Sequence, residues 1–161
     1  MKEKILTPEQ MLGERQRLRA AGARLVFTNG VFDLLHVGHV RYLQAARALG
    51  DVLVVGLNGD WSVRELKGTG RPLRGENDRA EILAALQCVD LVTVFPQIRA
   101  TQFLAAVRPA VYVKGGDYTT DTLDEEERSI LNEIGAEIRL IPFETGYSTS
   151  ALIEQIGKSR S

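Results

Sequence analysis

The hydrophobic positions of this chain follow two patterns that alternate along its length. Short continuous apolar runs between turn residues predict buried strands, and they lie at residues 24–29, 51–57, 91–95, 110–113 and 137–141. Apolar residues at helical spacing predict helices at residues 8–21, 38–49, 60–66, 78–87, 100–107, from the acidic run 121–127 to about 134, and at about 149–156. This alternation is typical of the α/β class, so we expect a doubly wound, five-stranded parallel sheet with helices on both faces. Such sheets bind ligands at the carboxyl ends of the strands, where the strand order reverses.

Composition and charge narrow the class of protein. The chain has 161 residues, of which 44% are hydrophobic, and this is enough for one domain with its own core. It carries 20 Lys and Arg against 21 Asp and Glu, so no bulk charge attracts it to nucleic acid or to an anionic membrane. The lone cysteine, Cys88, excludes an internal disulfide and a multi-cysteine metal site. We find no signal peptide and no apolar run long enough for a membrane helix, and expect a cytoplasmic protein.

The turn after the first predicted strand carries the clearest candidate chemistry. The stretch 29–39 reads NGVFDLLHVGH and contains the chain's only two histidines, His36 and His39. Gly30 permits a tight turn, and His36, Gly38 and His39 then fall at the start of the next helix, where free backbone N–H groups bind anions. Gly38 lets a phosphate approach the backbone. Two imidazoles three residues apart lie on one helix face, and two donors aimed at one anion suit phosphoryl or nucleotidyl transfer.

Other interpretations of this stretch stay open on the residues alone. The histidines are also compatible with a zinc site that recruits a carboxylate such as Asp33, or with ordinary helix capping. A glycine turn after a strand also occurs in dinucleotide-binding domains. However, the patterns GxGxxG and GxxxxGK[ST] are both absent, which argues against a hydride-transfer enzyme and a P-loop kinase.

The stretch GVFDLLHVGH (30–39) resembles the HxGH signature of the nucleotidyltransferase superfamily. Further segments follow in order and together resemble the adenylyltransferases of the ADP-heptose pathway: GLNGDWSVRELKG (56–68), RP (71–72), DR (78–79), VD (89–90), VKGGDY (113–118) and GYSTS (146–150). The resemblance covers residues 24–157 and implies that they form a catalytic core of Rossmann-like fold. Residues 1–22 would form an N-terminal helix, and the whole chain, 1–161, would be a single domain. In that family the domain is the second half of a bifunctional kinase–transferase or a separate chain. The length here implies the separate form. The resemblance further implies a homodimer that works after a separate sugar kinase.

The resemblance implies a reaction. The adenylyl group of ATP would pass to D-glycero-D-manno-heptose 1-phosphate, with release of pyrophosphate, for lipopolysaccharide core or a related surface glycan. The attacking phosphate oxygen is already ionised at pH 7, so no general base is needed. The site has to hold two polyanions in line and offset their charge. We expect Mg²⁺ to enter with ATP, bound mainly by phosphate and water, and assign no metal ligand in the chain.

The resemblance also implies roles for individual residues. The catalytic residues would be His36, His39 and Lys67. Of these, Lys67 lies in a Gly-rich loop predicted over 67–77. The nucleotide would be bound by Asn29, Gly30, Phe32, Gly38, Arg79, Ser148, Thr149 and Ser150. The acceptor would be bound by Asp33, Lys114 and Asp117.

Ordinary structural roles compete with several of these assignments. A loop lysine such as Lys67 is usually solvated, Arg79 fits a surface salt bridge, and Asp117 fits a turn cap. One of the residues 148–150 caps the last helix, and the acidic run 121–127 compensates a helix dipole on a solvated face. Arg71 and Arg74 are further candidates for closing the Gly-rich loop.

One departure bears on the nucleotide base. Relatives that transfer a cytidylyl group to glycerol phosphate carry an arginine before the last helix, where this chain has Phe143. This favours the adenylyl branch. The alternatives are a cytidylyltransferase that acts on glycerol phosphate or another alcohol phosphate, and a nucleotide-binding module without catalysis.

Overall fold

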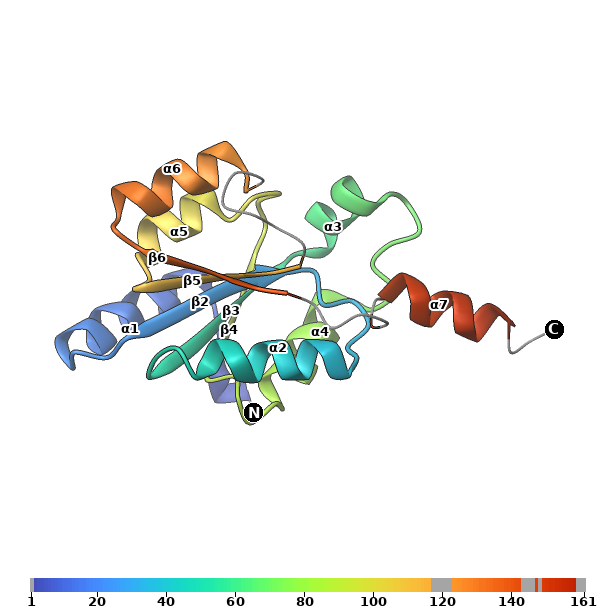
Figure 1. Cartoon of the computed structure of the whole chain (residues 1–161), viewed down its shortest axis with the longest axis horizontal. Helices are drawn as coiled ribbons and strands as arrows, with labels where there is room; N and C mark the ends of the chain where they lie inside the picture. The colour runs from blue at the N-terminus through green and yellow to red at the C-terminus, as the bar shows by residue number, and fades with distance from the viewer. Residues whose placement is uncertain (1, 117–122, 143–146, 148, 159–161) are drawn as a thin grey trace.

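A six-stranded, all-parallel sheet forms the centre of the protein (Figure 1). The computed structural model describes residues 2–116, 123–142, 147 and 149–158. The strands follow the order β1-β4-β3-β2-β5-β6 across the sheet. Their bounds are β1 (Ile5–Leu6), β2 (Leu25–Gly30), β3 (Val52–Asn58), β4 (Leu91–Phe95), β5 (Val111–Gly115) and β6 (Glu137–Ile141).

The prediction of five strands was wrong by one. Strand β1 has only two residues, too few to show any periodicity in the sequence, and it pairs with β4 through Ile5 and Val92. The side chain of Lys4 fastens this edge, because its Nζ donates to the carbonyl of Val89 at 2.7 Å. The other five strands were predicted.

Helices cover both faces of the sheet, as predicted (Figure 1). The helices α2 and α4 pack on one face, and α1, α5 and α6 pack on the other. Their bounds, with a short 3-10 helix at Lys2–Lys4, are α1 (Pro8–Ala20), α2 (Val37–Arg47), α3 (Asp60–Lys67), α4 (Glu76–Ala84), α5 (Thr101–Val107), α6 (Glu125–Glu133) and α7 (Thr149–Lys158).

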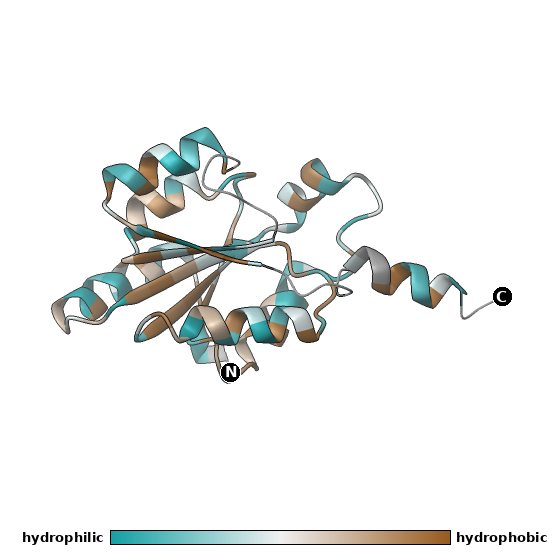
Figure 2. Cartoon of the chain, in the orientation of Figure 1, coloured by the Kyte–Doolittle hydropathy of each residue, from teal (hydrophilic) through white to brown (hydrophobic). Residues whose placement is uncertain are grey.

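The central strands read as continuous apolar runs because both of their faces are covered. In β2 and β3, Val26 and Val55 point into the core beneath α2 and α4, whereas Phe27 and Val54 point into the opposite core. The strands are correspondingly brown along most of their length in Figure 2, and the helices change from brown to teal around their axes. In the part of the chain that the structure describes, no helix combines the length and the apolar character needed to cross a membrane.

The strand order reverses between β2 and β5. A side chain of α2 forms hydrogen bonds with both strands at this junction. The Tyr42 hydroxyl donates to the carbonyl of Val113 on β5 at 3.1 Å. It also lies 2.6 Å from Oγ1 of Thr28 on β2, which therefore donates to it. A crevice opens at the carboxyl ends of the strands at such a reversal. Helix α7 projects from the body at the same end of the sheet (Figure 1).

Candidate active site

A cleft of about 870 Å³ lies at the carboxyl ends of β2, β3 and β5. Its wall combines the turn after β2 with the last turn of α3, the first turn of α6 and the side of α7. The residues that line it are Asn29, Gly30, Val31, Phe32, Asp33, His39, Tyr42, Asn58, Leu66, Lys67, Arg71, Ile98, Arg99, Lys114, Gly115, Leu123, Asp124, Glu127, Thr149 and Ile153. The crevice therefore lies where the parallel topology predicts it.

The two histidines meet at the N-terminus of α2. His36 is the N-cap residue and His39 lies in the first turn, and their ring centroids are 3.8 Å apart. The rings of Phe32 and His39 lie in a T-shaped arrangement at a centroid distance of 5.4 Å. A Cβ on Gly38 would lie 3.0 Å from Nδ1 of His36 and 3.0 Å from Cβ of Tyr147, so the side chain of any other residue would crowd this helix terminus. The sequence prediction that the imidazoles share one face of the helix is confirmed.

Both histidines are neutral at pH 7. Burial, and to a lesser extent the neighbouring His36, lower the pKa of His39 to about 4; burial also lowers the pKa of His36. The backbone N–H of His36 donates to Nδ1 of His39 at 3.4 Å, so the proton of the neutral His39 ring is on Nε2. His39 thus presents an uncharged N–H donor at the cleft.

The lowered pKa of His39 makes the stability of the fold depend on pH. An unfolded histidine titrates near pH 6.5, so between about pH 6.5 and 4 the unfolded state binds more protons than the folded state. The contribution of neutral, buried His39 to the free energy of unfolding is fully present above pH 6.5 and is lost as the pH falls toward 4. We expect the free energy of unfolding, from urea denaturation, to fall by about 2 kcal/mol more across this window in the wild type than in His39→Gln. Parallel pH profiles of the two proteins would contradict this prediction.

The charged side chains of the cleft wall are largely paired with one another. The wall contains the cations Lys67, Arg71, Arg99 and Lys114 and the carboxylates Asp33, Asp124 and Glu127. Each carboxylate pairs with one cation: Asp33 with Arg71, Asp124 with Arg99, and Glu127 with Lys114. Lys67 makes no ion pair with any residue that the structure describes. Among the described residues, Lys67 and the N-terminus of α2 therefore provide positive potential that no carboxylate of the cleft wall neutralises, and this potential attracts an anionic ligand.

Lys67 is the last residue of α3, which ends at Gly68 in a backbone conformation with φ 92°. Helix α4 begins at Glu76, two residues before the predicted start. The Gly-rich loop therefore spans 68–75 rather than 67–77, and Lys67 is fixed to the end of a helix.

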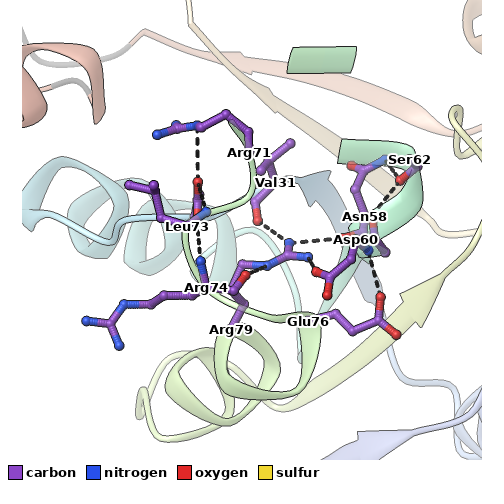
Figure 3. A network of polar contacts seen from close by, with 11 residues as sticks. Val31, Asn58, Asp60, Ser62, Arg71, Leu73, Arg74, Glu76 and Arg79 are labelled. Carbon is purple, nitrogen blue, oxygen red and sulfur yellow. Dashed lines mark hydrogen bonds and ion pairs between the residues drawn. The ribbon is translucent and has the colours of Figure 1, made fainter. Parts of the chain in front are cut away.

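Asp33 holds this loop, whose residues Leu73 and Arg74 are labelled in Figure 3, against the turn after β2. Its carboxylate is 4% exposed and accepts hydrogen bonds from the backbone N–H of Leu73 at 2.9 Å and of Arg74 at 3.1 Å. Nε of Arg71 lies 3.2 Å from its second oxygen. The role that we predicted for Asp33 was acceptor binding; the contacts in the structure are those of a residue that anchors a loop at the edge of the cleft.

Arg79 is buried behind the same loop (Figure 3). Its guanidinium donates to the carbonyls of Val31 at 2.7 Å, Asn58 at 2.9 Å and Arg74 at 3.0 Å, and to the carboxylate of Asp60 at 2.7 Å. These contacts differ from both roles that the sequence suggested, because Arg79 is neither a surface salt bridge nor part of the cleft lining. It connects the ends of β2 and β3 with the start of α3 and the Gly-rich loop.

The sequence interpretation missed a buried polar group on the β5 side of the cleft. Tyr112 and Glu127 belong to it, together with the predicted residues Asn29 and Lys114. A signal for Glu127 was present in the spacing: it shares a helix face with Leu131, which is fully buried, although Glu125 and Glu126 beside it are exposed. A carboxylate at a core-facing position calls for a partner.

The structure brings most of the predicted site residues together. Asn29, Gly30, Phe32, Asp33, His39, Lys67, Lys114 and Thr149 line the cleft, and His36 and Gly38 begin the helix that contributes His39. Oγ1 of Thr149 donates to the carbonyl of Leu34 at 3.5 Å, which joins the start of α7 to the histidine turn. Asp117, Ser148 and Phe143 lie outside the described residues, as does the side chain of Ser150.

Comparisons with known proteins find similar sequences. A family model described as cytidylyltransferase-like matches residues 27–155. The bifunctional protein HldE of Geobacter sulfurreducens is 52% identical over 141 residues, which cover 88% of this chain and 28% of that protein. The bifunctional protein HldE of Helicobacter pylori is 49% identical over 158 residues, or 98% of this chain and 32% of that protein. The chain thus spans about a third of these relatives.

A solved structure is similar as well. The crystal structure of the lipopolysaccharide core biosynthesis protein from Thermoplasma volcanium matches with a TM-score of 0.63 and 30% sequence identity. The match covers 79% of this chain and 100% of the other.

Proposed function

Since the chain belongs to the cytidylyltransferase-like family of nucleotidyltransferases, we propose that it transfers the adenylyl group of ATP to D-glycero-D-manno-heptose 1-phosphate. The observation that carries the proposal is the pair of adjacent histidines at the N-terminus of α2, of which His39 lines a cleft at the reversal of strand order. The product, ADP-heptose, would serve the synthesis of lipopolysaccharide core or a related surface glycan. The similarity to HldE proteins and to a lipopolysaccharide core biosynthesis protein supports this substrate.

The transfer needs positioning and charge stabilisation more than proton chemistry. An oxygen of the sugar phosphate attacks the α-phosphorus of ATP, and the bond from that phosphorus to the oxygen bridging it to the β-phosphate breaks. Pyrophosphate leaves with the bond's electron pair. His39 donates from Nε2 to an oxygen of the α-phosphate, and the backbone N–H groups at the start of α2 support the triphosphate. Lys67 approaches the leaving phosphates from the end of α3.

The donor set of the cleft fits a magnesium ion that travels with the triphosphate. Among the described residues, no group of three or more His, Cys, Asp or Glu side chains is arranged to hold a metal ion. Mg²⁺ usually keeps several waters and takes phosphate oxygens, so it needs few protein ligands. When bound, it neutralises part of the triphosphate charge. The wall offsets little of this charge, because Arg71, Arg99 and Lys114 are already paired with carboxylates of the wall. We also propose that a sugar kinase supplies the acceptor, and that the protein works as a homodimer.

A pyrophosphate-release assay tests the proposed reaction. The purified protein is mixed with Mg²⁺, with each of ATP, CTP, GTP and UTP, and with heptose 1-phosphate, glycerol 3-phosphate or another phosphorylated alcohol. We expect release with ATP and heptose 1-phosphate alone. Release with CTP and an alcohol phosphate would keep the mechanism and overturn the substrates. No release from folded protein that binds ATP would favour a nucleotide-binding module.

A further inference from the structure

We infer that the wall made by Asn29, Tyr112, Lys114 and Glu127, here called the β5 wall, recognises the sugar hydroxyl groups of the acceptor and not its phosphate. The inference rests on the proposed function, because it names the part of the acceptor that this wall contacts. Asn29, Lys114 and Glu127 line the cleft, and the hydroxyl of Tyr112 joins them from β5.

The β5 wall is organised around the carboxylate of Glu127. This residue lies in the first turn of α6 and is 5% exposed. Its Oε2 lies 3.3 Å from Nζ of Lys114 and 3.2 Å from the hydroxyl of Tyr112. The same Nζ lies 3.2 Å from the Tyr112 hydroxyl, which in turn lies 2.8 Å from Oδ1 of Asn29. These contacts set the orientation of all four polar groups before a ligand arrives.

The charge of the β5 wall is balanced within the wall. A buried carboxylate is costly unless a cation compensates it, and Lys114 compensates Glu127. Such a pair forms hydrogen bonds to uncharged groups but offers little net attraction to a phosphate dianion. The N-terminus of α2 differs, because its first turn contains no acidic residue and its backbone N–H groups attract anions. The cleft thus separates a region suited to phosphate from a region suited to hydroxyl groups.

The acceptor capacity of the β5 wall also fits hydroxyl groups. An ionised carboxylate accepts about four hydrogen bonds. The described side-chain donors near Glu127 are Lys114 and Tyr112, and the single hydroxyl proton of Tyr112 is shared between Glu127 and Oδ1 of Asn29. A sugar hydroxyl both donates and accepts, so it can donate to the carboxylate of Glu127 and accept from the amide of Asn29. A phosphate dianion only accepts, and Glu127 would repel it.

The substitution Glu127→Gln distinguishes a wall that binds the phosphate of the acceptor from one that binds its hydroxyl groups, because the two predict opposite changes in affinity for the acceptor. It retains the shape of the side chain but removes the negative charge and one strong acceptor. If the wall holds phosphate, loss of the negative charge strengthens binding of the acceptor. If the wall holds hydroxyl groups, loss of the charged acceptor weakens it.

Titration calorimetry of the full chain measures this sign. Heptose 1-phosphate and inorganic phosphate are titrated into the wild type, Glu127→Gln and Glu126→Gln, the last being a matched loss of charge at an exposed position one residue away. We expect Glu127→Gln to bind heptose 1-phosphate about tenfold more weakly and inorganic phosphate at least as tightly as the wild type. Glu126→Gln should match the wild type with both.

Tighter or unchanged binding of heptose 1-phosphate to Glu127→Gln overturns the inference, and so does a wild type that fails to bind this sugar phosphate. The pyrophosphate assay, run in parallel, reports on the proposed function separately. Weakened sugar phosphate binding without pyrophosphate release would sustain the inference and reject the reaction. Pyrophosphate release by the wild type, together with unchanged binding of heptose 1-phosphate to Glu127→Gln, would support the reaction and reject the inference.

A measurement on the wild type alone guards against misfolding of the variant. Ethyl phosphate has the phosphate of the acceptor but none of the sugar hydroxyl groups. We expect it to bind the wild type about tenfold more weakly than heptose 1-phosphate does. Equal affinity would overturn the inference whatever the state of Glu127→Gln, which is checked by circular dichroism and by its affinity for MgATP.

Discussion

Replacement of His39 with alanine is expected to lower kcat by about two to three orders of magnitude, the usual effect of removing one donor to a developing charge. The imidazole is neutral at pH 7 and carries its proton on Nε2, so in the proposed reaction it would donate to the α-phosphate without bringing a charge of its own. The affinity for MgATP should change only slightly, because the N-terminus of α2 and Lys67 remain. Single-turnover kinetics and titration with MgATP measure the two quantities separately.

The variant His39→Gln is the matched control for this prediction. Its amide places an N–H donor near the position of Nε2, so we expect it to keep more of the wild-type kcat than His39→Ala. If His39→Ala turned over at the wild-type rate, His39 would have no part in the chemical step. If instead kcat stayed constant and only the affinity for MgATP fell, His39 would serve nucleotide binding alone.

Replacement of Arg79 with methionine is expected to lower the free energy of unfolding by about 3 to 5 kcal/mol. Arg79 is 1% exposed and donates to three backbone carbonyls and to Asp60. Methionine fills a similar volume but leaves these acceptors without their donor in a buried place. Urea denaturation at pH 7 measures the loss.

Two further variants sharpen this second prediction. Arg64→Met removes a guanidinium from an exposed position on α3, and its cost should stay within about 0.5 kcal/mol. Arg79→Lys keeps the charge but has three donors that diverge from one nitrogen, so it should fall between the wild type and Arg79→Met. Equal stabilities of Arg79→Met and Arg64→Met would show that the buried contacts of Arg79 contribute nothing to the fold.

The sequence predicted the fold where local patterns determine it. The long strands and the helices follow from apolar runs and helical spacing, and α1 begins at a local capping box formed by Thr7 and Gln10. Strand β1 could not be found in this way, because two residues contain no period and their pairing with β4 depends on a partner more than 80 residues away.

The candidate site was predictable where residues are close in the sequence. His36, Gly38 and His39 fall within one helical turn, so their spacing alone brings them together. The environment of Arg79 and Glu127 depends on tertiary packing: each has an ion-pair partner 13 or more residues away, Asp60 for Arg79 and Lys114 for Glu127. Residue type alone suggests that both are solvated. The spacing of Glu127 from Leu131 is a sequence signal for the burial of Glu127, whereas the burial of Arg79 is shown only by the three-dimensional arrangement.

The contacts of Arg79 have a consequence for how this fold can diversify. Three of its four acceptors are backbone carbonyls, at Val31, Asn58 and Arg74, and every amino acid supplies a carbonyl. The side chains at positions 31 and 74 are therefore not required for the contact, and mutation can alter them while the rim of the cleft keeps its shape. Substitutions at these two positions, natural or engineered, can thus change which acceptor substrates the cleft binds while the contacts of Arg79 that support the rim are kept.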